Sequence, residues 1–139
     1  MFFDNASNCF SMCNVQTMRM MRIDGIHNVR DIGGYTTLDG KKIKQGLLYR
    51  GTEMDNAADP TFSLTAEGKK EMKNVLGIKY DMDIRKQLNG SSNVLGVSYR
   101  AYDAPHYNSV FYEPGITSIK NIFIDLANSN NYPMYVHCT

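Results

Sequence analysis

Four strand-like and two helix-like segments are interspersed along residues 47–137, and this order leaves few folds open. The clearest strand covers residues 78–85, where apolar and polar side chains alternate with a period of two. Helices that connect strands favour right-handed crossovers and a mainly parallel sheet. We therefore predict an α/β fold in which helices flank the sheet. The predicted strands are 47–50, 78–85, 97–102 and 132–137, and the predicted helices are 65–76 and 117–128.

The helix expected at residues 65–76 has recognisable signals at both of its ends. Thr65 is a favourable N-cap, and Glu67 lies in the first turn, where the helix dipole favours a negative charge. Gly77 suits the position after the last turn, because glycine tolerates the left-handed backbone conformation common there. These signals predict where the helix begins and ends.

Residues 1–22 are rich in Met and Asn and show no clear periodicity, so we expect a loosely ordered N-terminal arm. The organised part is expected over residues 23–139, as the N-terminal part of an α/β domain. The pairs Gly33-Gly34 and Asp39-Gly40 are typical of turns, and the second pair predicts a hairpin. A chain of 139 residues has the length of one domain.

The charge and hydropathy of the chain exclude several classes of function. A net charge of +1 provides no basic surface for nucleic acid. No apolar run approaches the roughly 18 residues of a transmembrane helix, and the N-terminus lacks the apolar core of a signal peptide. These observations favour a cytoplasmic protein. Cys9 and Cys13 have no second Cys or His pair nearby, so we expect no zinc site.

Side chains that can carry out chemistry lie at the ends of three predicted strands. The carboxyl ends of parallel strands meet at one edge of a sheet, and ligands bind there in open α/β sheets. We therefore expect the polar residues at these strand ends to line one rim. In chain order they are Asp83, Arg85, Asp103 and Cys138.

Five short motifs occur in an order that matches a known family. They are Asn28-Val29-Arg30-Asp31-Ile32-Gly33-Gly34, Gly46-Leu47-Leu48-Tyr49-Arg50, Leu64-Thr65, Leu76-Gly77-Ile78 with Asp83-Ile84-Arg85, and Pro133 with His137-Cys138-Thr139. This series resembles the bacterial tyrosine-phosphatase-like proteins, a branch of the cysteine-dependent protein tyrosine and dual-specificity phosphatases. Each motif alone occurs by chance, but together they cover residues 23–139 in the right order.

The resemblance implies hydrolysis of phosphomonoesters without a metal or other cofactor. Cys138, as a thiolate, would attack phosphorus and form a cysteinyl-phosphate that water then hydrolyses. The general acid would be Asp103, at the strand-to-loop junction where the superfamily carries its acid loop, or else Asp83. The substrate would be a phosphorylated protein, a small phosphomonoester or a phosphoinositide. The residues implied in phosphate binding are Thr139, His137 and Arg85.

Each of these candidates also has a structural interpretation. Asp103 precedes Ala-Pro and can initiate a turn. Asp83 can form an ion pair with Arg85 or cap the end of its strand. The resemblance implies that His137 orients the loop through hydrogen bonds and does not act as a base. The choice between the two aspartates as general acid stays open at this point.

The family pattern His-Cys-x5-Arg continues past Thr139, where this sequence ends, so the sequence does not contain the loop arginine. Three hypotheses follow. The first is a phosphatase truncated inside the loop, with its C-terminal helical part missing. The second is a catalytically inactive remnant that binds a phosphorylated partner or packs in a complex. The third is a redox or metal-binding thiol protein that uses Cys9, Cys13 and Cys138, and their spacing gives it little support.

Overall fold

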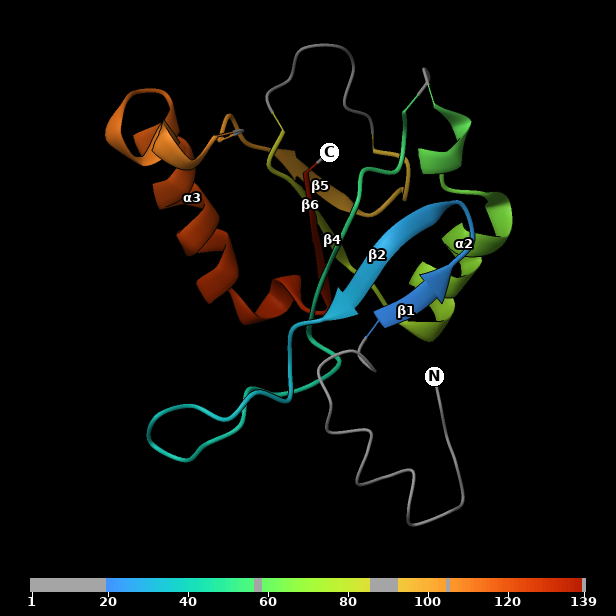
Figure 1. Cartoon of the computed structure of the whole chain (residues 1–139), viewed down its shortest axis with the longest axis horizontal. Helices are drawn as coiled ribbons and strands as arrows, with labels where there is room; N and C mark the ends of the chain where they lie inside the picture. The colour runs from blue at the N-terminus through green and yellow to red at the C-terminus, as the bar shows by residue number, and fades with distance from the viewer. Residues whose placement is uncertain (1–19, 57–58, 86–92, 105, 139) are drawn as a thin grey trace.

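The computed structural model describes residues 20–56, 59–85, 93–104 and 106–138. Within these ranges the chain forms one mixed sheet of six strands, with helices on both of its faces (Figure 1). The order of the strands across the sheet is β1-β2-β3-β6-β4-β5. The strands are β1 Met20–Ile23, β2 Ile26–Asp31, β3 Leu48–Gly51, β4 Tyr80–Asp83, β5 Ser98–Ala101 and β6 Met134–His137.

Four neighbouring strands, β3, β6, β4 and β5, run parallel to one another. This confirms the predicted α/β fold with a mainly parallel sheet. β1 and β2 form an antiparallel hairpin at one edge, and β2 is also antiparallel to β3. The last strand in the chain, β6, lies between β3 and β4, so both of its edges are paired. Its carboxyl end is therefore held firmly within the sheet.

The sheet begins earlier in the chain than the sequence predicted. Residues 20–22 were assigned to the N-terminal arm, but they belong to β1 and pair with β2. In β2, Asn28 has a left-handed backbone conformation (φ 57°), and Ile26 and Val29 are both buried although they lie three residues apart. This irregularity breaks the period of two and hides the hairpin from a pattern search. Residues 1–19 lie outside the described residues.

The two predicted helices are present with slightly different ends. α2 covers Ala66–Lys70 and continues into a π-helical turn, η3, at Glu71–Val75, so the helical segment matches the prediction. The Thr65 hydroxyl accepts a hydrogen bond from the Gly68 N–H at 3.1 Å, which confirms the predicted N-cap. α3 covers Gly115–Ala127. The short 3₁₀ helices are η2 Pro60–Phe62, η4 Tyr107–Phe111 and η5 Ser129–Asn131.

Both predicted turns are also present. Gly34 and Gly40 have positive φ values of 86° and 81°. The Thr37 N–H donates to the Lys41 carbonyl at 2.7 Å, which closes the hairpin around Gly40. In the described parts of the chain, none of the helices is both long enough and apolar enough to cross a membrane.

Each face of the sheet has its own apolar core. On one face, a buried cluster contains Met72 of η3, Leu76 directly after η3, and Tyr135 of β6. On the other face, α3 packs Ile122 and Leu126 against a buried cluster that contains residues of β4 and β6. Figure 1 shows α2 and α3 on opposite sides of the sheet. Both faces of the sheet therefore carry packed helical segments.

A buried carboxylate anchors α3 to the sheet. Asp125 accepts hydrogen bonds from the hydroxyl groups of Tyr80 and Tyr102, and Arg100 NH1 lies 3.2 Å from its Oδ1. Burial pushes the pKa of Asp125 up, but these hydrogen bonds outweigh it and lower the pKa below its usual value. Asp125 is therefore ionised at neutral pH and ties α3 to β4 and to the segment around β5.

Candidate active site at the carboxyl ends of the strands

The parallel register brings three strand ends into one row. Gly51 of β3 is the partner of His137 in β6, and His137 is the partner of Asp83 in β4. Cys138 follows directly after this row, and Asp103 lies two residues after β5, which is parallel to β4. The structure therefore places these strand ends at one edge of the sheet, as the sequence predicted.

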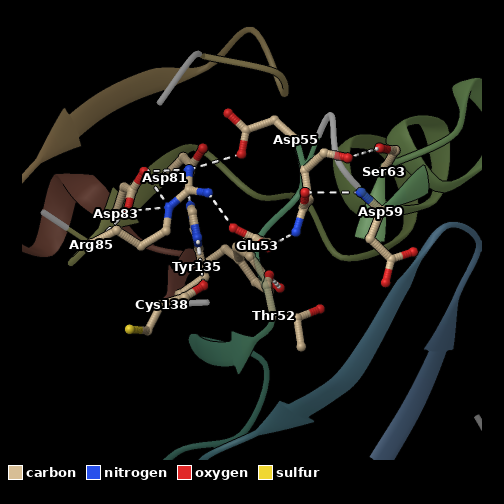
Figure 2. A network of polar contacts seen from close by, with 12 residues as sticks. Thr52, Glu53, Asp55, Asp59, Ser63, Asp81, Asp83, Arg85, Tyr135 and Cys138 are labelled. Atoms are coloured by element: carbon tan, nitrogen blue, oxygen red, sulfur yellow. Dashed lines mark hydrogen bonds and ion pairs between the residues drawn. The ribbon is translucent and has the colours of Figure 1, made fainter. Parts of the chain in front are cut away.

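Arg85 is surrounded by three carboxylates from two segments of the chain (Figure 2). Its Nε donates to Asp83 Oδ1 at 3.0 Å, and its NH2 donates to Asp83 Oδ2 at 2.7 Å. NH1 donates to Glu53 Oε2 at 2.6 Å, and NH2 also donates to Asp55 Oδ1 at 2.8 Å. This includes the Asp83–Arg85 ion pair that the sequence analysis gave as an alternative. A role of Arg85 in phosphate binding stays a prediction.

Asp83 is fully buried at the centre of this network. In addition to the guanidinium, it accepts hydrogen bonds from the Arg85 backbone N–H at 2.9 Å and from the Tyr99 hydroxyl at 3.1 Å. Burial pushes the pKa of Asp83 up, but the hydrogen bonds from Arg85 and the nearby His137 outweigh it and lower the pKa below its usual value. Burial likewise disfavours the charged form of Arg85, but hydrogen bonds to the carboxylates raise its pKa. Both groups are therefore charged near neutral pH.

Glu53 and Asp55 are two residues of this network that the sequence analysis missed. They follow β3, and the Asn56 amide holds Glu53 by donating to Oε1 at 2.6 Å. A signal for them was present in the sequence, because Glu53 and Asp55 lie three and five residues after the strand predicted at 47–50. The strand-end rule applies to that strand as well, and it would have placed both carboxylates at the same rim.

A second buried pair, Asp81 and His137, lies beside the Arg85 network. Asp81 Oδ1 is 3.2 Å from His137 Nε2, and both side chains are almost completely buried. The Tyr135 ring stacks on the imidazole, with ring centroids 5.6 Å apart, and its hydroxyl donates to the Thr52 carbonyl at 2.7 Å. Burial raises the pKa of Asp81, and His137 opposes this rise. The period-two pattern placed Asp81 on the polar face but gave it no role.

The candidate nucleophile lies at the edge of these networks. Cys138 is half-buried, and Figure 2 shows its sulfur directed away from the Arg85 guanidinium. Asp103 is half-buried in the segment after β5. Thr139, together with Cys9 and Cys13, lies outside the described residues. Within the described ranges, no three His, Cys, Asp or Glu side chains are grouped in a way that could hold a metal ion.

A comparison with protein families identifies a related family. The model described as "Tyrosine phosphatase family" matches residues 21–139. The matched region begins in β1 and includes the other five strands, the Arg85 network and Cys138. Among curated proteins, no relative matches the chain.

Proposed function

The chain belongs to the tyrosine phosphatase family, and we propose that it hydrolyses phosphotyrosine or related phosphomonoesters through a covalent intermediate on Cys138. The observation that carries the proposal is the position of Cys138, directly after a central strand that is paired on both edges. Such a strand end holds a nucleophile in a fixed place while the residues after it are free to wrap around an anion.

The reaction has two steps. In the first, the Cys138 thiolate forms a bond to phosphorus while the bond to the leaving oxygen breaks, and a general acid protonates that oxygen. In the second, water attacks phosphorus, the S–P bond breaks, and inorganic phosphate leaves while the acid regains its proton. Backbone N–H groups and an arginine in the His-Cys-x5-Arg loop would stabilise the thiolate and the phosphoryl oxygens. The printed sequence contains the first three residues of that loop.

The contacts of Asp83 favour Asp103 as the general acid. An acid must hold a proton at the working pH, but the pKa of Asp83 is lowered by its bonds to Arg85 despite the opposing effect of burial. Asp83 is also enclosed by Arg85 and Tyr99. Asp103 is half-buried in the segment after β5, at the same edge of the sheet.

Trapping the intermediate tests the proposed mechanism directly. Protein expressed from its complete reading frame would be mixed with p-nitrophenyl phosphate, quenched rapidly in acid and digested. We expect the peptide that contains Cys138 to be heavier by one phosphoryl group. Absence of this adduct during measurable turnover would contradict the covalent mechanism. Absence of turnover together with binding of a phosphopeptide would instead support the inactive, phosphate-binding alternative.

Replacing Asp103 by Asn tests the general acid. We expect kcat to fall by about 10²–10⁴-fold with phenyl phosphate, whose leaving oxygen needs a proton, and KM to change little. The loss should be much smaller with p-nitrophenyl phosphate, whose leaving group departs readily as an anion. Asp39→Asn, which changes an exposed carboxylate in the hairpin, is the matched control and should leave both rates unchanged. Equal losses with both substrates would remove Asp103 from this role.

A further inference from the structure

A hairpin at residues 35–43 projects from the sheet as a separate arm (Figure 1). It connects β2 with β3, and it extends on the side of the molecule opposite to the label C. Asp31 fixes its base, because one carboxylate oxygen accepts a hydrogen bond from the Gly33 N–H at 2.7 Å and the other accepts one from the Gly46 N–H at 2.8 Å. The hairpin is therefore held in place by bonds at both of its ends.

The hairpin exposes three large apolar side chains. Leu38 lies at the tip and is fully exposed, while Ile43 and Tyr35 are 44% and 39% exposed. The Ile43 N–H donates to the Tyr35 carbonyl at 2.9 Å, so these two residues are neighbours across the hairpin. Turn positions usually hold Gly, Asn, Asp or Ser, so the turn itself does not require a leucine. Single exposed apolar side chains are common, but three on one projecting arm favour a contact surface.

Basic side chains accompany these apolar residues. The whole chain has a net charge of +1, but residues 30–50 contain five Lys and Arg residues and two Asp residues, which gives a local net charge of +3. At the tip, Asp39 forms an ion pair with Lys41 at 2.8 Å. Lys42 and Lys44 are exposed, and neither forms an ion pair with a residue that the structure describes. The hairpin therefore presents uncompensated positive charge next to apolar side chains.

Two arginines extend this positive charge to the base of the hairpin. Arg30 in β2 and Arg50 in β3 are direct cross-strand partners, and both are exposed. Within the described ranges, neither guanidinium forms a hydrogen bond or an ion pair. Like charges directly opposite each other on neighbouring strands are destabilising, so an anionic partner would relieve a repulsion that the chain alone does not.

We propose that the 35–43 hairpin docks on an anionic lipid surface, where Leu38 enters the headgroup region and Lys42 and Lys44 contact lipid phosphates. The apolar tip is the reason for choosing lipid, because nucleic acid would bind the lysines but would give the exposed Leu38 no contact. Tyr35 suits the boundary between lipid and water, where tyrosine is enriched in membrane proteins.

This surface is separate from the candidate active site. The hairpin precedes the amino end of β3, whereas Cys138 follows the carboxyl end of β6, and these two strands are parallel neighbours. The two features therefore lie at opposite edges of the sheet. The inference does not depend on the proposed function, and it holds whether or not Cys138 is a nucleophile.

Flotation with lipid vesicles tests the electrostatic part. Protein from the complete reading frame would be mixed with phosphatidylcholine vesicles that contain no anionic lipid or about 30% phosphatidylserine. We expect binding to the anionic vesicles alone, and weaker binding at high salt. The Lys42→Glu, Lys44→Glu double variant should lower the affinity at least about tenfold. Absence of binding by the wild type would overturn the proposal.

The matched control changes the same amount of charge elsewhere. Lys73 and Lys120 are exposed on the helical segments η3 and α3. A Lys73→Glu, Lys120→Glu double variant should bind the anionic vesicles about as well as the wild type. If both double variants lose the same affinity, net charge and not the hairpin determines binding, and the proposal is wrong.

A tryptophan at the tip tests whether the hairpin enters the lipid. The printed sequence contains no tryptophan, and the emission of Leu38→Trp can be taken as the difference from the wild-type spectrum. We expect this emission to shift to shorter wavelength on anionic vesicles. Val75→Trp, at a position 77% exposed in η3, is the control and should show no shift. An unshifted Leu38→Trp emission from vesicle-bound protein would contradict insertion of the tip.

Leu38→Ser separates a lipid surface from a purely electrostatic partner. We expect it to weaken binding to anionic vesicles by about threefold or more, because the apolar contact is lost. Unchanged vesicle binding, or an equally tight binding of double-stranded DNA by both the wild type and Leu38→Ser, would overturn the choice of lipid. All of the hairpin substitutions are at exposed positions, so circular dichroism should show a native fold for each variant.

Discussion

Cys138→Ser is expected to abolish phosphomonoester hydrolysis, with a loss on the order of 10⁴-fold or more. The reason is chemical, since a serine hydroxyl is almost entirely protonated at neutral pH and no base is placed to activate it in the mechanism proposed above. The substitution preserves shape, and Cys138 is half-buried at a strand end, so the fold should be maintained. Hydrolysis of p-nitrophenyl phosphate by protein from the complete reading frame is the measurement.

The matched control replaces the other two cysteines. A Cys9→Ser, Cys13→Ser double variant should retain the wild-type rate, because these residues have no part in the proposed reaction. Protein that stops at residue 139 should show no hydrolysis above the Cys138→Ser background, since the loop arginine is not among its residues. Turnover that survives Cys138→Ser would contradict the assignment of the nucleophile.

Arg85→Met is expected to lower the free energy of unfolding by about 3–5 kcal/mol. Methionine fills a similar volume but leaves Asp83, Glu53 and Asp55 without the guanidinium that binds all three. Asp83 is fully buried, and a buried carboxylate that loses its partner keeps its desolvation cost. For a domain of this length, the loss corresponds to a Tm lower by roughly 10–20 °C. Thermal or urea unfolding followed by circular dichroism measures it.

The decrease in the free energy of unfolding caused by Arg85→Met should become smaller as the pH falls. In the wild type, burial raises the pKa of Asp83, but Arg85 and His137 together lower it below its usual value. The stabilisation is therefore present above about pH 4 and is lost on further acidification. In the variant the unpaired carboxyl takes up a proton at a higher pH, which removes the buried charge. Arg100→Met is the control, because its side chain is 57% exposed and its ion pair should contribute less than about 1 kcal/mol. An equal decrease in the free energy of unfolding for Arg85→Met and Arg100→Met would contradict the central role of Arg85.

The sequence predicted the parallel part of the fold because the signals there are local. The alternation at residues 78–85 and the capping residue Thr65 reflect periodicities and hydrogen bonds within a few residues. β1 escaped prediction because its partner β2 contains Asn28 in a left-handed conformation, which breaks the alternation. The extent of β1 depends on pairing with a neighbouring strand, and pairing is not visible in one short segment.

In the candidate site, too, local sequence signals predicted some features, and contacts between distant segments determined the others. The strand-end rule placed Asp83, Asp103 and Cys138 at one edge, and the parallel register of β4, β5 and β6 puts them there. The rule did not predict that Arg85 also binds Glu53 and Asp55, because these residues come from a segment about 30 residues earlier in the chain. Ion pairs between distant segments depend on which strands become neighbours. The sequence likewise showed Asp81 only as a polar residue in a strand of alternating character, and its contact with His137 could not be predicted from that pattern.

Taken alone, the amino-acid sequence determined the class of the fold, the motifs of the family and the identity of the candidate nucleophile. The fold class follows from periodicity and short-range spacing, and the candidate nucleophile follows from the resemblance that the motifs carry. Only the tertiary structure decided that Arg85 is bound by three carboxylates and that His137 faces Asp81. The pairing of β6 with β4 places His137 beside Asp81, and the segment after β3 brings Glu53 and Asp55 to Arg85. These side chains come from distant parts of the chain, and the low dielectric of their buried surroundings strengthens the electrostatic interactions between them.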